Sequence, residues 1–250
     1  VIPSFNHARF LRIALASVRA QTLTNWAAIV VDNHSEDDTE SVVNEFNDQR
    51  ISRVLIRNEG IISASRNLGI SLAKGTYIAF LDADDAWHPR KLEIQTAWME
   101  AHPEAALTGT RTAVRGMLDN LPPLTDSFDV KPITFRRLLF VSMLPTRSVM
   151  IRASLANRFV SGKRYSEDYL LWLSILAEGQ QAFLLDLPLA YSFKADFGEA
   201  GLSSHLWRMH CEVLDTYRRL QRAGHLSGAL RLILTIYSLM KFSRRVALSC

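Results

Sequence analysis

Cysteine is scarce in this 250-residue chain, which contains only Cys211 and Cys250. Two cysteines exclude a disulfide framework and a CxxC metal knuckle, and this usage is typical of a reducing cytosol. The sequence has no uncharged apolar run near the roughly 20 residues that cross a bilayer. Residues Val1–Ser4 carry neither the charged nor the apolar segment of a secretory signal, so we expect a cytoplasmic protein.

The composition is that of an ordinary globular protein, with 48% hydrophobic and 22% charged residues. Internal repeats and low-complexity segments are absent from the sequence. The net charge of +4 suits an anionic ligand, an anionic membrane surface or nucleic acid equally well. Much of the excess positive charge lies after Arg208, where Glu212 and Asp215 are the only acidic residues.

Apolar runs and amphipathic segments alternate over the first hundred residues. Runs of strand length occupy residues 1–2, 26–31, 51–56 and 76–81, and helical signals cover residues 10–18, 35–38, 63–73 and 89–100. This alternation predicts βαβ units, a parallel sheet and an α/β fold. Ligands of such sheets gather at the carboxyl ends of the strands, where this chain carries Ser4, Asn6, Asp32 and Asp82.

The alternation breaks after Gly109. The predicted elements are then a loop or short hairpin over 111–131, a helix over 132–140, a strand over 148–152, a helix over 167–177 and a helical tail from His205.

The sharpest local feature is Asp82-Ala83-Asp84-Asp85, directly after the apolar run 76–81. Three carboxylates in four residues repel one another unless a cation or strong hydrogen-bond donors lie among them. Hard oxygen ligands of this kind suit Mg²⁺ or Mn²⁺ held together with substrate phosphates. The alternative is a solvated acidic turn that caps the helix opened by Pro89, and such turns more often have that role.

A second acidic residue, Asp32, follows the strand 26–31 and can accept hydrogen bonds from a base or a ribose. Ser35, Asp37 and Thr39 are better explained as caps of the following helix. The third motif is a helix that begins after Gly60, where Arg66 can order the acidic loop or contact a diphosphate. A purely structural role for Arg66 is an equal alternative.

Glu167 and Asp168 open a later helix. One acid in the first helical turn stabilises the helix dipole. Because adjacent helical residues point in different directions, one acid can cap the helix while the other points into a cleft and acts as a general base.

The ordered set of these motifs resembles the family 2 glycosyltransferases of the GT-A fold, over about residues 1–195. The matching segments are Val1-Ile2-Pro3-Ser4-Phe5-Asn6, Ile29-Val30-Val31-Asp32, Asn58-Glu59-Gly60, Ala64-Ser65-Arg66-Asn67-Leu68-Gly69, Phe80-Leu81-Asp82-Ala83-Asp84-Asp85 and Glu167-Asp168-Tyr169-Leu170-Leu171-Trp172. The resemblance implies a Rossmann-like sheet that is mixed but mainly parallel and is flanked by helices, with a helical C-terminal extension. It divides the chain into a catalytic domain over 1–200, with a nucleotide-binding half over 1–110 and an acceptor half over 111–200, and an extension over 201–250.

The resemblance also implies the chemistry. The family transfers a sugar with inversion from a nucleoside diphosphate sugar, often a UDP-sugar, to an acceptor hydroxyl. Asp168, with Glu167 as the fallback, would be the catalytic base, and Asp84 with Asp82 would bind a Mg²⁺ or Mn²⁺ ion that offsets charge on the departing nucleotide. The residues implied in nucleotide binding are Pro3, Phe5, Asn6, Asp32, Arg66, Asp82 and Ala83.

Three departures from the family pattern stand out. His34 occupies a position where the family commonly has a glycine, which puts the identity of the base in question. The stretch Tyr191-Ser192-Phe193-Lys194 lacks the usual Arg or His pattern, and His205 is a weak replacement as metal ligand. The first strand is also short, so we expect the natural protein to begin several residues earlier. The positions that select the sugar are expected within 111–147 and near Lys194.

The tail over 226–248 has polar residues on one side of a helical wheel: Ser227, Arg231, Thr235, Ser238, Lys241 and Arg245. A basic amphipathic helix of this kind can lie on the inner face of the cell membrane, which would suit a lipid-linked saccharide acceptor. Packing against the catalytic domain, with the charges in solvent, is a slightly stronger expectation.

Two further functions compete with the transferase. A sugar-nucleotide pyrophosphorylase predicts a Gly-rich basic loop after the first strand, where this chain has Pro3-Ser4-Phe5-Asn6-His7. A non-catalytic nucleotide-sugar-binding protein remains an alternative, against which the intact Asp84 and Asp168 argue. Nucleic acid is not an expected partner, because the basic tail lacks interleaved aromatic residues. A bacterial polysaccharide or lipopolysaccharide pathway is implied by the resemblance alone.

Overall fold

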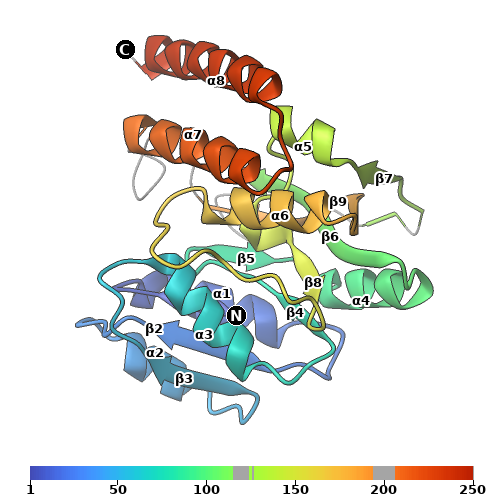
Figure 1. Ribbon diagram of the computed structural model, residues 1–250. Helices are drawn as coiled ribbons and strands as arrows, with labels where there is room; N and C mark the ends of the chain where they lie inside the picture. Colours follow the sequence, from blue (N-terminus) through green and yellow to red (C-terminus); the bar gives the residue numbers. More distant parts are fainter. Residues whose placement is uncertain (115–123, 126, 194–205, 250) are drawn as a thin grey trace.

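The computed structural model describes residues 1–114, 124–125, 127–193 and 206–249. Figure 1 shows the N-terminal strands and their helices in the lower part of the molecule, α6 above them, and α7 and α8 side by side at the top. None of the described helices is long and apolar enough to cross a membrane.

The N-terminal sheet is entirely parallel, in the order β1-β2-β3. Its strands and connecting helices are β1 (Ile2–Ser4), α1 (Ala8–Arg19), β2 (Ala28–Asp32), α2 (Thr39–Glu45), β3 (Ile51–Leu55) and α3 (Ile62–Leu72). Every residue of β2 is buried, as expected for a central strand. Ser4 pairs with Asp32 in the register of β1 and β2, so the polar residues that follow these strands meet at one edge.

The second sheet is mixed and has the order β4-β8-β6-β9-β5, with β7 paired to β9. Its strands are β4 (Tyr77–Ala79), β5 (Asp85–Trp87), β6 (Ala105–Val114), β7 (Val130–Ile133), β8 (Met150–Arg152) and β9 (Gln181–Ser192). Only β6 and β9 pair in parallel. The amide N–H of Leu81 donates to the Val1 carbonyl at 3.1 Å, which joins this sheet to β1. The N-terminal sheet is thus wholly parallel, whereas the described pairs of the second sheet are antiparallel except for β6 with β9.

The remaining helices are α4 (Lys91–Ala101), α5 (Phe135–Phe140), α6 (Glu167–Ala177), α7 (Leu206–Arg222) and α8 (Gly228–Ser249), with a short 3₁₀ turn at Thr146–Ser148. The predicted helix over 132–140 is wrong at its start, because Pro132 lies in β7. Among the described strands β7 pairs only with β9, and a proline without an N–H is tolerated on such an edge. The loop or short hairpin predicted over 111–131 is also wrong at its ends, since β6 continues to Val114 and β7 begins at Val130, and these two strands pair with β9 rather than with each other. The helical tail divides at Gly224, whose φ is +81°.

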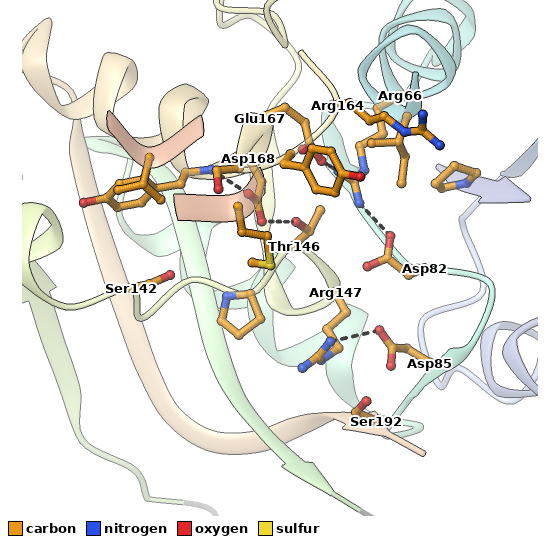
Figure 2. A pocket seen from close by; sticks show the side chains of 18 of the residues that line it. Arg66, Asp82, Asp85, Ser142, Thr146, Arg147, Arg164, Glu167, Asp168 and Ser192 are labelled. Carbon is orange, nitrogen blue, oxygen red and sulfur yellow. Dashed lines mark hydrogen bonds and ion pairs between the residues drawn. The ribbon is translucent and has the colours of Figure 1, made fainter. Parts of the chain in front are cut away.

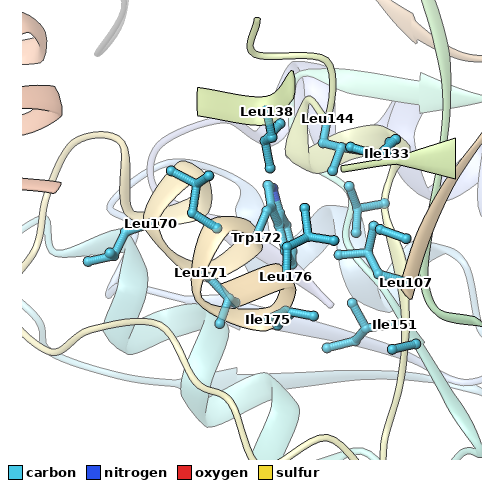
Figure 3. Packing of buried hydrophobic residues seen from close by; sticks show 14 of the residues in the cluster. Leu107, Ile133, Leu138, Leu144, Ile151, Leu170, Leu171, Trp172, Ile175 and Leu176 are labelled. Atoms are coloured by element: carbon cyan, nitrogen blue, oxygen red, sulfur yellow. The ribbon is translucent and has the colours of Figure 1, made fainter. Parts of the chain in front are cut away.

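Two hydrophobic clusters form the core. One lies around β1, β2 and α1, and the other is built from the second sheet, α5, α6 and α7. Figure 3 shows the second cluster around Trp172, which is 1% exposed. The rings of Phe80 and Phe159 lie 5.9 and 6.0 Å from that of Trp172. These clusters, the helices on the sheets and the C-terminal helical region confirm the mixed α/β class.

Asp37 caps two helices at once. Its carboxylate accepts hydrogen bonds from the amide of Ala8 at 2.8 Å and the amide of Thr39 at 3.1 Å, which are the first residues of α1 and α2. The capping role expected for Asp37 is therefore confirmed.

Candidate active site

A cavity of about 860 Å³ extends from the carboxyl end of β1 to the helices α7 and α8. Eight of the ten predicted site residues line it: Pro3, Phe5, Arg66, Asp82, Ala83, Asp84, Glu167 and Asp168. They come from β1, α3, the β4–β5 loop and α6, which are far apart in the sequence. Figure 2 shows the acidic side chains around the central part of this cavity.

Arg66 links two parts of the site. Its guanidinium donates to Asp82 Oδ1 at 2.7 Å and to Glu167 Oε1, and it lies 5.4 Å from the ring centroid of Phe159. Its side chain is only 3% exposed. Burial alone would lower the pKa of Arg66, but the charges of Asp82 and Glu167 raise it above its ordinary value. Arg66 therefore remains a cation and fixes the acidic loop against the start of α6.

The three carboxylates of the acidic loop have different surroundings. Asp85 is 3% exposed and accepts a hydrogen bond from Arg147 at 3.2 Å (Figure 2). Burial raises the pKa of Asp85 to about 7, the Arg147 cation opposes this, and the charges of Asp82 and Asp84 add to it. Asp85 thus belongs to the wall of the cavity, where β5 pairs it with Ser192. Asp82 is held by Arg66, and Asp84 lines the cavity.

The side chains of Glu167 and Asp168 point in different directions, as expected for neighbours on a helix. Glu167 is 6% exposed, and burial raises its pKa to about 7 against the opposing charge of Arg66. The Asp168 carboxylate accepts a hydrogen bond from the Thr146 hydroxyl at 2.6 Å and another from the Tyr169 amide at 2.7 Å. Ser166, just before them, has a φ of +53°, and such strained backbone is most frequent at functional sites. One acid is therefore locked in an ion pair, while the other is half-buried at the cavity surface.

Asp32 and Asn6 lie beside the cavity and not among its lining residues. Asp32 is 1% exposed, and its carboxylate accepts hydrogen bonds from the Ser35 amide at 2.9 Å, the Ser35 hydroxyl at 2.6 Å and Arg53 at 3.2 Å. Asn6 Oδ1 accepts the amide of Glu36 at 2.8 Å. Asp32 and Asn6 thus shape the loop that borders the site.

His34 adopts a φ of +55°, the left-handed region that glycine enters without strain. This conformation accounts for a glycine at the equivalent place in the family pattern. The His34 side chain is exposed and does not line the cavity, so it leaves the space beside Asn33 and Pro3 open. Lys194 and His205, which were considered as further site residues, lie outside the described part of the chain.

The described residues contain no group of three or more His, Cys, Asp or Glu side chains placed to hold a metal ion. Asp82 and Asp84 nevertheless fit Mg²⁺ or Mn²⁺, because these ions are commonly held by one or two carboxylates together with substrate phosphates. The like charges that raise the pKa of Asp85 show how negative this loop is. The donor set is therefore of the right chemistry for a divalent ion shared with a diphosphate.

Several lining residues had no signal in the sequence. Thr146 and Arg147 lie in a short turn before β8 and hold Asp168 and Asp85. His210 on α7 faces the same cavity, as do Lys241 and Arg245 on α8, two residues of the polar side of the tail. Only the tertiary fold brings these residues beside α6.

Residues 1–161 match the family described as Glycosyl transferase family 2. One curated relative is the UDP-Glc:alpha-D-GlcNAc-diphosphoundecaprenol beta-1,3-glucosyltransferase WfgD of Escherichia coli, 33% identical over 180 residues, or 71% of this chain and 69% of the relative. Another is the putative teichuronic acid biosynthesis glycosyltransferase TuaG of Bacillus subtilis, 28% identical over 227 residues, or 89% of this chain and 87% of the relative. These comparisons agree with the resemblance drawn from the motifs.

Solved structures share the fold. The Staphylococcus aureus TarS fragment 1–349 with UDP-GlcNAc has a TM-score of 0.71 and 17% identity, covering 95% of this chain and 70% of that chain. The mannosyltransferase PcManGT of Pyrobaculum calidifontis, with GDP-Man and Mn²⁺, has a TM-score of 0.67 and 16% identity, covering 99% of this chain and 73% of that chain. At this identity the likeness concerns the fold alone.

Replacing Arg66 by methionine should destabilise the protein in a pH-dependent manner. Loss of one partner of a buried ion pair costs about 3–5 kcal/mol of unfolding free energy. The raised pKa of Glu167 means that its contribution to stability is complete below about 4.5 and is lost as the pH rises through about 7. Without the Arg66 cation the pKa of Glu167 rises further. The loss of unfolding free energy in the variant should therefore be larger at pH 8 than at pH 5.5.

Urea unfolding of both proteins at the two pH values measures this difference. The control is Arg12→Met, which removes an exposed ion pair with Glu45 and should change stability little at either pH. If Arg66→Met loses the same unfolding free energy at both pH values, the buried charge that has lost its partner is not that of Glu167.

Proposed function

Because the chain belongs to glycosyl transferase family 2, we propose that it transfers a sugar from a UDP-sugar to a hydroxyl of a saccharide acceptor, with inversion at the anomeric carbon. The observation that carries this proposal is the convergence of Asp82, Asp84 and Asp168 on one cavity. The WfgD relative is named for UDP-Glc, and TarS was solved with UDP-GlcNAc, which supports uracil as the base.

The donor would occupy the part of the cavity between β1 and the acidic loop. We assign Pro3, Phe5 and Asn33 to the nucleoside, with Asp32 and Asn6 shaping the loop around it. Asp84, with Asp82, would hold Mg²⁺ or Mn²⁺ at the diphosphate. A divalent ion bound there would neutralise charge on the departing nucleotide. Arg66 positions Asp82 and keeps the negative charge of the loop in place.

Asp168 is the group that we assign as catalytic base. Its carboxylate would take the proton of the acceptor hydroxyl while that oxygen attacks the anomeric carbon, and the bond from this carbon to the diphosphate oxygen breaks. Thr146 holds the carboxylate in place through its hydroxyl. Glu167, the fallback base, is less suited because its carboxylate is occupied by Arg66.

For the acceptor we propose a saccharide linked through a diphosphate to a lipid, in bacterial polysaccharide synthesis. The name of the WfgD relative contains such an acceptor, and that of TuaG contains teichuronic acid biosynthesis. We propose the division into a nucleotide-binding half over 1–110 and an acceptor half over 111–200, with an extension over 201–250, on the family resemblance alone, because one core cluster joins residues of all three parts. The extension supplies cavity-lining residues, so it would take part in binding the acceptor.

Helix α8 would place this site at an anionic lipid surface on the inner face of the cell membrane. Its apolar side faces outward, with five large residues 44–61% exposed: Leu232, Ile233, Ile236, Leu239 and Met240. Its polar residues Ser238, Lys241 and Arg245 face the cavity instead. From Thr216 to Cys250 the sequence contains seven Arg or Lys and no acid, and the five that do not line the cavity favour an anionic bilayer over a neutral partner.

Calorimetric titration with UDP, GDP, TDP and CDP, with and without Mn²⁺, tests the donor site. We expect UDP to bind with Mn²⁺ at least tenfold more tightly than the other three, and Asp84→Ala to lose at least tenfold of that affinity. Asp38→Ala is the matched control, because Asp38 lies outside the cavity and makes no cap hydrogen bond. Preference for GDP would refute the assignment of uracil, and binding of none of the four would refute the donor site.

Replacing Asp168 by asparagine should lower kcat by about 10²–10⁴-fold, the usual contribution of a general base. The affinity for UDP with Mn²⁺ should change less than twofold, because Asp168 lies on the acceptor side. The assay is UDP release from UDP-glucose with an α-GlcNAc-diphosphate lipid. If Glu167→Gln abolishes turnover in a folded protein while Asp168→Asn keeps it, the base is Glu167.

Flotation with vesicles of neutral lipid, with or without 30% (about one third) anionic phosphatidylglycerol, tests the α8 surface. We expect binding to the anionic vesicles and loss of most of it in Ile233→Glu with Ile236→Glu, since burial of each isoleucine contributes about 1.5–3 kcal/mol. The control pair Leu55→Glu and Leu72→Glu changes equally exposed residues elsewhere. A stable dimer in solution that the α8 variant dissociates, without vesicle binding, would assign this face to a second copy of the chain.

A further inference from the structure

A cluster of basic side chains lies in the same cavity, at the end formed by α7 and α8. Its members are His210 on α7 and Lys241 and Arg245 on α8, and all three line the cavity. Figure 1 shows α6 between this helix pair and the layer that carries the N-terminal strands. The cluster and the acidic loop thus lie on opposite sides of the helix that supplies Asp168.

His210 has a buried atom without a protein partner. Its side chain is 6% exposed, and its Nδ1 lies 3.1 Å from the Ser238 hydroxyl. Its Nε2 is buried and has no hydrogen-bond partner in the described part of the chain. A buried polar atom left unpaired is destabilising, so a ligand that accepts a hydrogen bond from this nitrogen would remove that penalty. The ring is held in place by Phe242, stacked at 4.9 Å between centroids.

Lys241 and Arg245 add two cations at the same place. Burial lowers the pKa of Lys241, and the charge of Arg245 lowers it further. Burial and then the charge of Arg245 also lower the pKa of His210, so the three groups lie within electrostatic reach of one another. Two cations and a histidine at one end of a cavity form a favourable site for an anion.

In the described part of the chain, the two acids of α7 pair with cations outside the cluster. Glu212 and Asp215 of α7 both accept hydrogen bonds from Lys163, at 2.6 and 3.3 Å, and Asp215 also binds Arg219. Four apolar side chains form a wall of the cavity beside the cluster: Leu206, Met209, Val213 and Phe242.

We propose that His210, Lys241 and Arg245 bind the phosphate or diphosphate group that joins the acceptor saccharide to its lipid. This assignment rests on the proposed function, because it places the acceptor anion on the far side of Asp168 from the donor. The Lys241 and Arg245 cations pair with the phosphate oxygens, and His210 Nε2 donates one hydrogen bond to them. The apolar wall accepts the first part of the lipid chain, and α8 lies between this site and solvent.

The probe is geranyl diphosphate, with geraniol as its uncharged counterpart and UDP with Mn²⁺ as the donor-site reference. In calorimetry at 0.15 M (about physiological) salt, geranyl diphosphate should bind at least tenfold more tightly than geraniol. Lys241→Met with Arg245→Met keeps much of the apolar packing and should weaken diphosphate binding at least tenfold. His210→Phe keeps the ring stacking and should weaken it several-fold without changing geraniol binding.

Arg244→Ala is the matched control, an exposed cation on the same helix that does not line the cavity, and it should leave both affinities within twofold. An equal loss in Arg244→Ala would show unspecific attraction and overturn the proposal. Full diphosphate affinity in the double variant would overturn it as well. Loss of UDP binding in the double variant would assign the cluster to the donor diphosphate, whereas absence of UDP binding in the unaltered protein would be a failure of the proposed function itself.

Discussion

The guanidinium of Arg66 holds together three segments that are far apart in the sequence: helix α3, the acidic loop after β4 and the start of α6. Its two carboxylate partners, Asp82 and Glu167, come from different halves of the molecule. The buried cation permits the two acids to face one cavity, because its charge offsets the repulsion between their carboxylates. The position of Asp168 depends on the same link, since it is the next residue of the helix that Glu167 anchors. A structural ion pair thus sets the geometry of the proposed donor and acceptor sides.

Much of this site was readable in the sequence because its residues follow strands. Asp32 ends a strand of the parallel sheet, and the acidic loop follows β4, which hydrogen bonds of Ala79 and Leu81 with Val1 hold beside β1. The adjacency of Glu167 and Asp168 also predicted that they would separate, since helical neighbours point apart. The sequence pattern did not show that the carboxylates of the acidic loop have different surroundings. Asp85 is buried beside Arg147 because β5 pairs with a strand about a hundred residues later, and no local signal encodes that pairing.

The wrong sequence predictions for the second half of the chain also arise from pairing between distant strands. The sequence predicts a loop or a short hairpin over 111–131, but β6 extends to Val114 and β7 begins at Val130, and both pair with β9. Strand formation there depends on β9 as a partner and not on local propensity. The orientation of α8 is a further example. Its amphipathic pattern was visible, but only the fold decides that its polar side faces a cavity and its apolar side faces outward.

Charge changes sign along the cavity, and this ordering constrains any reaction in it. The acidic loop at one end attracts a cation and, through it, a diphosphate, while the His210 cluster at the other end attracts an anion directly. A diphosphate donor without a cation would be repelled from the acidic loop and drawn toward the cluster. The cation would therefore decide which end a nucleotide occupies, which leaves the basic end for an acceptor that carries its own phosphate. Asp168 lies on the helix between the two ends, where an attacking hydroxyl would meet the donor sugar.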